Sequence, residues 1–288
     1  MTPNPKVALQ STRISSGLTA LVVGGTTGIG SAVARKLAAI GCSRVIILGR
    51  DEKRAGDVLD RMRDTATKGF EGSFIKGDIS YVRGIKAALE SLKSLLGNDK
   101  LDYVVMCQNG PPTGTVNINE DGEGKEFTIQ AISRFLLTHL IINNELLNPN
   151  AKKVAENGRS KPLLTIDQSR RDSTVLDSVI LEFNARYPQY TFYHLHPGLV
   201  KTELFDIHLF PFPLSYIAGL GLLMMGSTPD EYANIPVYIL VHPDARKELG
   251  EGKFWDHRIK VKNPSVWPSA RENREKLWNK LLAMTEEK

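Results

Sequence analysis

The chain has 288 residues, of which 41% are hydrophobic and 24% are charged, a composition typical of a globular protein that buries a sizeable core. Its formal net charge is +5, but basic and acidic residues are mixed along the chain and no basic stripe carries interleaved aromatic residues. Nucleic acid is therefore excluded as an expected partner.

The first hundred residues predict a short arm followed by alternating strands and helices. Residues 1–17 are polar and hold no apolar signal segment, so they predict a partly ordered N-terminal arm. Beyond them, short apolar runs typical of buried parallel strands alternate with segments whose apolar residues recur at helical spacing. The strands are expected at Leu18–Val23, Arg44–Gly49 and 72–78, and the helices at 29–41, 51–64 and 82–96.

The middle of the chain continues this alternation. A strand at 101–107 precedes a long helix at Glu123–Leu147. Residues 148–161 are polar and turn-rich and predict a linker, after which the run 162–166 (PLLTI) predicts the next strand. A helix at Val175–Tyr187 and a strand at 190–196 follow. His194 and His196 share one face of that strand, where packing is their expected role.

The segment His208–Gly226 carries no formal charge and is just long enough to suggest a membrane span. Two prolines interrupt its start and two glycines its middle, which favours an apolar lid over a substrate, at about 203–227. Membrane association stays open as the less favoured interpretation. The lid residues expected to contact the substrate are Phe205, Phe210, Phe212 and Tyr216.

The C-terminal part predicts a helix that begins after Thr228, a strand at 252–256 and a terminal helix at 268–284. Strand–helix alternation from end to end indicates an α/β fold with a doubly wound parallel sheet (a Rossmann fold) in a single domain, residues 18–288. Two distant cysteines form neither a disulfide framework nor a metal-ligand pattern, so no metal site is expected. The sequence also contains no N-x-S/T glycosylation sequon other than one in which x is proline. Both observations favour an intracellular, cytoplasmic location.

A glycine-rich loop, residues 24–30 (GGTTGIG), lies between the first strand and the first helix. Glycines at such a place permit a tight turn and let backbone amides approach a pyrophosphate at the helix N-terminus. About twenty residues later the second strand ends at Arg50, whose guanidinium favours the extra phosphate of NADP(H). Asp51, directly after it, is the acid that would favour NAD instead.

These residues resemble the short-chain dehydrogenase/reductase family. The loop resembles its TGxxxGxG motif, Asp78 in KGDIS resembles its adenine-contacting acid, and HPGLVKTEL (196–204) resembles its PGxxxT segment. The resemblance spans about Thr19 to Leu204, has the character of divergent fungal members from specialised metabolism, and implies a nicotinamide cofactor held by Gly24, Thr27, Gly28, Ile29, Gly30, Arg50, Asp78, Gly110 and Thr202.

The family's catalytic Asn, Ser, Tyr and Lys have no counterparts at the matching positions. None of the eight tyrosines has a lysine four residues later. Matching the helix and strand around 181–198 puts the Tyr position at Ser169 and the Lys position at Ser173. The strand-end Ser position then falls at Asp167 or Gln168, with the intervening loop nearly gone, and the Asn position falls at Gln130.

Several functions fit this pattern. The favoured hypothesis is an NADP-binding enzyme, with the cofactor weakly bound or used without redox, that cyclises, isomerises or dehydrates an apolar small molecule through Asp167, Gln130 and Ser169. The alternatives are an unorthodox NADPH-dependent reductase, a catalytically dead binding partner or sensor, and a gene model that omits the loop. A second copy of the chain is an open option as a partner.

Overall fold

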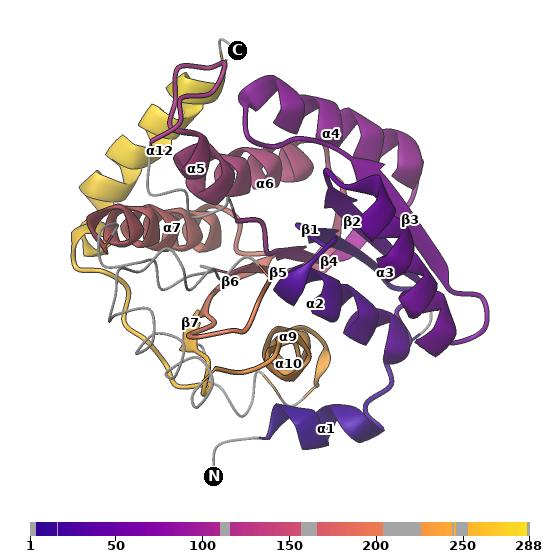
Figure 1. Ribbon diagram of the computed structural model, residues 1–288. Coiled ribbons are helices and arrows are strands. Elements are labelled where there is room, and N and C mark those ends of the chain that lie inside the picture. The colour runs from indigo at the N-terminus through magenta and orange to yellow at the C-terminus, as the bar shows by residue number, and fades with distance from the viewer. Residues whose placement is uncertain are drawn as a thin grey trace, which may run out of the picture.

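The computed structural model describes residues 4–15, 17–109, 116–156, 166–203, 226–243, 245 and 253–286, without the side chains of 150, 153–156 and 166–170. Its centre is a seven-stranded sheet in the order β3-β2-β1-β4-β5-β6-β7, and every neighbouring pair is parallel (Figure 1). This confirms the predicted doubly wound sheet. The strands are β1 (Thr19–Val23), β2 (Arg44–Gly49), β3 (Glu71–Lys76), β4 (Leu101–Met106), β5 (Leu147–Glu156), β6 (Thr191–His196) and β7 (Phe254–Asp256).

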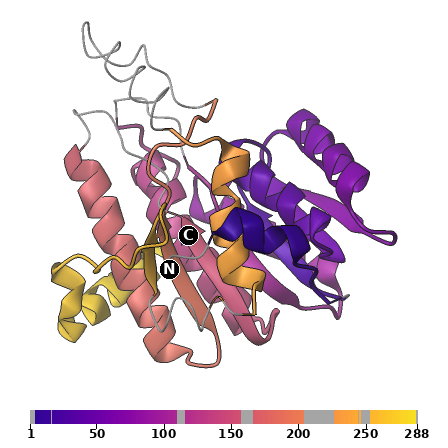
Figure 2. The same ribbon diagram turned by 90° about the horizontal axis from the view of Figure 1, so that it is seen from below.

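Helices cover both faces of the sheet (Figures 1 and 2). On one face lie α4 (Val82–Leu96), α5 (Lys125–Phe127), α6 (Ser133–Asn143), α7 (Ile166–Arg186) and α12 (Arg271–Glu286). On the other lie α1 (Pro5–Ser11), α2 (Gly28–Ala39), α3 (Glu52–Thr65), α9 (Pro229–Tyr232) and α10 (Asn234–Val241), and a 3-10 turn (Trp267–Ser269) precedes α12. Each face buries its own apolar cluster, so both sides of the sheet are core.

The N-terminal arm and the helix after the lid segment pack together. Asn4 caps α1, and Leu9 of this helix is buried in the cluster that also contains α10. Thr228 and Glu231 form a reciprocal capping box at the start of α9, which confirms the predicted helix start.

The fifth strand lies where the sequence predicts a linker. β5 occupies Leu147–Glu156. Of the strand expected at 162–166, residues 162–165 lie outside the described residues, and Ile166 is the first residue of α7. The strand is polar yet central, since β4 and β6 pair with it on either side and satisfy its backbone groups. The half-buried Lys152 of this strand donates a hydrogen bond from Nζ to the carbonyl of Leu240, 2.9 Å away, near the end of α10.

The expected long helix at Glu123–Leu147 is interrupted. α5 passes through a π-helical turn, Thr128–Ile132, into α6, which ends at Asn143. Within the turn, the Ser133 hydroxyl donates to the carbonyl of Ile129 at 2.6 Å and so takes an acceptor that a regular helix would use for its own backbone. The π turn contains Gln130, the position that the sequence predicts to be catalytic.

Among the helices that the structure describes, none is both long and apolar enough to cross a membrane. The predicted lid, about 203–227, lies outside the described residues except at its two ends.

Candidate dinucleotide site

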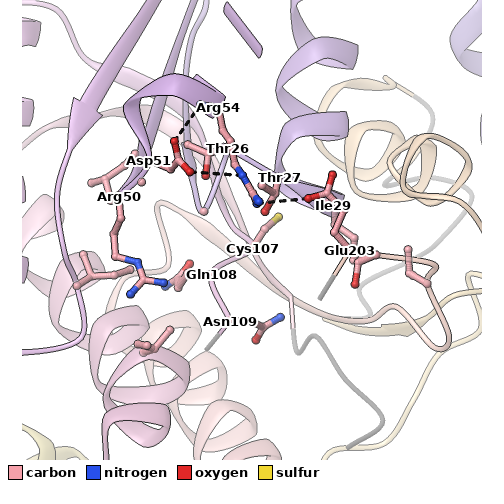
Figure 3. Close-up of a pocket in the computed structure, with 18 of the residues that line it drawn as sticks. Thr26, Thr27, Ile29, Arg50, Asp51, Arg54, Cys107, Gln108, Asn109 and Glu203 are labelled. Carbon is pink, nitrogen blue, oxygen red and sulfur yellow. Dashed lines mark hydrogen bonds and ion pairs between the residues drawn. The ribbon is translucent and has the colours of Figure 1, made fainter. Parts of the chain in front are cut away.

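A cavity of about 660 Å³ opens at the carboxyl ends of the strands, where the chain order switches between β1 and β4 (Figure 3). Parallel α/β sheets bind ligands at this crevice, because the loops on its two sides diverge there. The loops after β1, β2, β3, β4 and β6 supply its walls. They contain most of the predicted cofactor residues: Gly24, Thr27, Gly28, Ile29, Arg50, Asp78 and Thr202.

The glycine loop is shaped so that side chains cannot be added to it. Gly24 has φ +74°, and a Cβ there would lie 2.8 Å from the Cα of Gln108. A Cβ on Gly30 would lie 2.2 Å from the carbonyl oxygen of Gly24. The loop therefore packs backbone against backbone and leaves the first amides of α2 at the cavity wall, as the binding of a pyrophosphate requires.

Two charged residues, Arg50 and Asp51, follow β2, and the acid forms the N-cap of the next helix. Asp51 caps α3, because its Oδ1 accepts a hydrogen bond from the backbone nitrogen of Arg54 at 3.0 Å. Arg50 lines the cavity and is exposed to it (Figure 3). Both Arg50 and Asp51 line the cavity, and of the two it is Asp51 that also caps the helix.

Arg54, a residue that the sequence does not single out, bridges two sides of the cavity rim. Its Nε lies 3.4 Å from Asp51 Oδ2, and its Nη1 lies 3.3 Å from Glu203 Oε2 (Figure 3). Glu203 is the last described residue before the lid segment, and Ser227 forms backbone hydrogen bonds with Leu199 and Lys201 where the described chain resumes. The two described ends of that segment are thus joined at the rim. Gly110 and the four named lid residues lie outside the described part of the chain.

Asp78 and Thr202 complete the walls. The Asp78 carboxylate accepts a hydrogen bond from the backbone nitrogen of Ser80 at 3.0 Å, which fixes the loop after β3. Thr202 faces the glycine loop closely enough that a Cβ on Gly28 would lie 3.3 Å from its methyl group. Both residues line the cavity.

Behind the cavity, a fully buried arginine organises the π turn. Arg134 is 0% exposed and donates to the carbonyls of Gln130 (2.6 Å) and Gln108 (2.8 Å), and to Gln130 Oε1 at 3.2 Å. Gln108 in turn donates from Nε2 to the Ser133 hydroxyl. Gln130 is therefore buried beside Arg134 and is not among the residues that line the cavity, although its neighbour Ile129 is. The sequence contains one sign of this network, because an arginine stands within the mainly apolar helical run AISRFLLT and would need buried hydrogen-bond acceptors there.

Asp167 and Gln168, which the sequence assigns to a strand end, lie instead in the first turn of α7, and β5 ends ten residues before this helix begins. The residues between them, 157–165, and the side chains of Asp167 and Ser169 lie outside the described part, whereas Ser173 is described and half-buried. Among the described residues that line the cavity there is no tyrosine, lysine or histidine.

A second polar cluster stands beside α7, and sequence reasoning gave its histidines only a packing role. Burial alone raises the pKa of Asp177, but hydrogen bonds from His194 and Ser265 outweigh it and hold that pKa below its usual value. Burial, and then the neighbouring His194, lower the pKa of His196 to about 3. Its imidazole is therefore neutral at physiological pH.

The family comparison agrees with this geometry. The family model described as "short chain dehydrogenase" matches residues 18–147. The chain belongs to the short-chain dehydrogenase/reductase superfamily. It is 30% identical over 217 residues to the oxidoreductase AN1596 of Emericella nidulans, a match that covers 70% of this chain and 64% of that protein. It is 27% identical over 243 residues to the oxidoreductase andH of Emericella variicolor, a match that covers 78% of this chain and 69% of that protein.

A solved structure shares the fold. The short-chain dehydrogenase from Burkholderia cenocepacia J2315 in complex with NADP superimposes with a TM-score of 0.65 at 17% identity, covering 83% of this chain and 95% of that one. This likeness confirms the Rossmann fold inferred from the strand alternation, and the family model over residues 18–147 confirms the superfamily inferred from the glycine loop.

The two cysteines should differ sharply in reactivity. Burial raises the pKa of Cys42 to about 12, and this side chain is 0% exposed, whereas Cys107 lines the cavity. A thiol-reactive disulfide reagent at pH 8 should therefore label one cysteine of the folded protein rapidly and the second only after denaturation. A Cys42→Ser variant should still be labelled rapidly at its remaining thiol. Rapid labelling of a folded Cys107→Ser variant would contradict the assignment of the reactive thiol to Cys107.

Proposed function

We propose that this protein is an enzyme that binds NADP(H) and acts on an apolar small molecule by chemistry that needs no Tyr/Lys proton relay and does not consume the nicotinamide. One observation carries the proposal: the cavity lies against the glycine loop and the start of α2, while its described lining offers no tyrosine, lysine or histidine as a proton donor. Cyclisation, isomerisation or dehydration of a bound conformer requires positioning and polarisation and no hydride.

The residues present fit the cofactor. Gly24 and Gly30 let the loop pack tightly, backbone against backbone, at the N-terminus of α2, and that helix end favours the negative charge of a pyrophosphate. Arg50 would hold the 2′-phosphate, since Asp51 is engaged as a helix cap. A bound reduced nicotinamide supplies a hydride donor, and the proposal is that this capacity goes unused.

The substrate contacts are assigned to the lid and to the start of α7. Phe205, Phe210, Phe212 and Tyr216 would cover an apolar molecule, since apolar burial contributes about 25 cal/mol per Å². Asp167 and Ser169, in the first turn of α7, would orient its polar group, and Gln130 would support them through the buried Arg134 network.

A reductase is the second candidate, and a specific observation favours it. The two fungal relatives described above carry the name oxidoreductase. Hydride transfer without a positioned general acid is slower by a factor of roughly 10² to 10⁴, so a proton from water or from the substrate itself would leave a slow but measurable reaction.

The test is turnover of a panel of apolar ketones, alcohols and polyenes with NADPH, with products read by mass spectrometry and the reduced nicotinamide by its absorbance. The proposal predicts a product formed while the nicotinamide absorbance stays constant, and slower formation by Asp167→Ala with unchanged NADPH affinity. Asp57→Ala, on the exposed face of α3, is the matched control. Loss of NADPH equal to the product formed would establish that the protein is a reductase. If no compound gave a product, the protein would be assigned as a binding protein without catalytic activity.

The cofactor preference has its own test. Arg50→Ala should weaken NADPH binding by about 10- to 100-fold, because a charge-assisted hydrogen bond to phosphate contributes roughly 1.5–3 kcal/mol. NADH affinity should change little, and Arg61→Ala on the exposed side of α3 should leave both affinities unchanged. Titration calorimetry that found NADH bound more tightly than NADPH by the unmodified protein would reject the role of Arg50.

A further inference from the structure

Three side chains that do not line the cavity converge between α7 and β6. Asp177 comes from α7, and His194 and His196 come from β6, where residues two apart project from the same face. The two imidazole rings lie with their centroids 4.5 Å apart. One potential metal-ligating atom from each of the three residues lies within 4.8 Å of the others.

The carboxylate fixes the tautomer of His194. Asp177 Oδ1 lies 2.8 Å from His194 Nδ1, and Asp177 Oδ2 accepts hydrogen bonds from the backbone nitrogen (2.8 Å) and hydroxyl (2.6 Å) of Ser265. An ionised carboxylate only accepts hydrogen bonds, so Nδ1 of His194 carries the proton. The other ring nitrogen, Nε2, takes no part in this pair.

The Nε2 atom of His194 is buried and orphaned. His194 is 0% exposed, and its Nε2 has no hydrogen-bond partner among the residues that the structure describes. Buried polar atoms are normally satisfied, so an orphaned ring nitrogen at a polar cluster points to a group that binds there. His196, also on this face and half-buried, brings a second imidazole ring to within 4.5 Å of that of His194, centroid to centroid.

We propose that this cluster binds a divalent transition-metal ion of the zinc type. Nε2 of His194 and a ring nitrogen of His196 are its protein ligands, and water fills the remaining positions. Asp177 is the supporting carboxylate, because a metal-bound histidine typically donates its other N–H to such a group, which orients the ring and raises its basicity. Imidazole nitrogen is a preferred ligand of Zn²⁺ and Co²⁺, whereas Mg²⁺ and Ca²⁺ prefer oxygen. The site is independent of the proposed function, since none of the three side chains lines the cavity.

The experiment uses tag-free, full-length protein treated with a chelator and then titrated with Co²⁺, whose visible absorption reports coordination by nitrogen ligands. The unmodified protein should bind one equivalent, and Zn²⁺ should displace it. His196→Gln, which keeps a neutral polar side chain at a half-buried position, should abolish the Co²⁺ absorption. Asp177→Asn should weaken binding by about 10- to 100-fold, the usual effect of losing a supporting carboxylate. His242→Gln, at the end of α10 on the opposite face of the sheet, is the matched control and should bind as the unmodified protein does.

Thermal unfolding separates loss of binding from loss of the fold. Zn²⁺ should raise the unfolding temperature of the unmodified protein and of His242→Gln, because a ligand that binds only the folded state stabilises it, and should leave that of His196→Gln unchanged. The absence of both Co²⁺ absorption and a Zn²⁺-dependent shift in the unmodified protein would overturn the site. Equal shifts in the unmodified protein and His196→Gln would overturn it as well.

Discussion

Gly30→Ala should abolish measurable dinucleotide binding, a loss of more than about 100-fold. The added Cβ would lie 2.2 Å from the carbonyl oxygen of Gly24, so the glycine loop must move away from the start of α2. That movement displaces the amides that would face a pyrophosphate, and the overpacking should also lower the free energy of unfolding by about 1–3 kcal/mol.

The matched control is Gly56→Ala in α3, a helical glycine whose added Cβ would meet nothing within 4 Å. It should keep full affinity for the dinucleotide and raise the free energy of unfolding by about 0.5–1 kcal/mol, since alanine is the better helix former. Titration calorimetry and urea unfolding give both quantities. Normal binding by Gly30→Ala would show that the loop does not hold the cofactor.

The second large effect is expected at Asp177. Replacing it by alanine in metal-free protein should lower the free energy of unfolding by about 3–5 kcal/mol, as expected when one partner of a buried polar pair is removed. The buried Nδ1–H of His194 and both donors of the half-buried Ser265 would then lose their acceptor.

The position of Asp177 explains why so much stability depends on it. It joins α7 to β6 through His194, and to the segment before α12 through Ser265. Ser265→Ala, which removes only the hydroxyl donor, should lower the free energy of unfolding by about 1 kcal/mol, and the exposed Asp60→Ala should leave it unchanged. Urea unfolding of the three variants in the presence of a chelator measures the ranking. Asp177→Ala that unfolded at the same urea concentration as Asp60→Ala would contradict it.

The features that the sequence predicted correctly are local ones. The glycine loop, the strand before it and the helix after it depend on neighbouring residues, and β1, β2 and α2 lie within a residue or two of their predicted bounds. The capping box at Thr228 is equally local. Periodicity and turn chemistry suffice in such places, because no distant contact competes with them.

The features that it missed depend on distant partners. β5 is a strand because β4 and β6 pair with it, although its residues read as a linker, and misplacing it moved the strand-end position of the catalytic set onto α7. The sequence offers Asp51 as a ribose-binding acid and did not predict that this residue also caps α3. The Asp177–His194 pair joins residues 17 positions apart on different elements, and no spacing rule predicts it.

The central claim, that the NADP(H) site works without hydride transfer, is tested most directly with NADPH deuterated at the transferable position of the nicotinamide. Turnover with this cofactor distinguishes a bound but silent nicotinamide from one that gives up a hydride and recovers it, a cycle that absorbance alone would miss. We predict a product that contains no deuterium and a cofactor recovered with its label intact. Deuterium in the product, or its loss from the recovered cofactor in step with turnover, would contradict the claim.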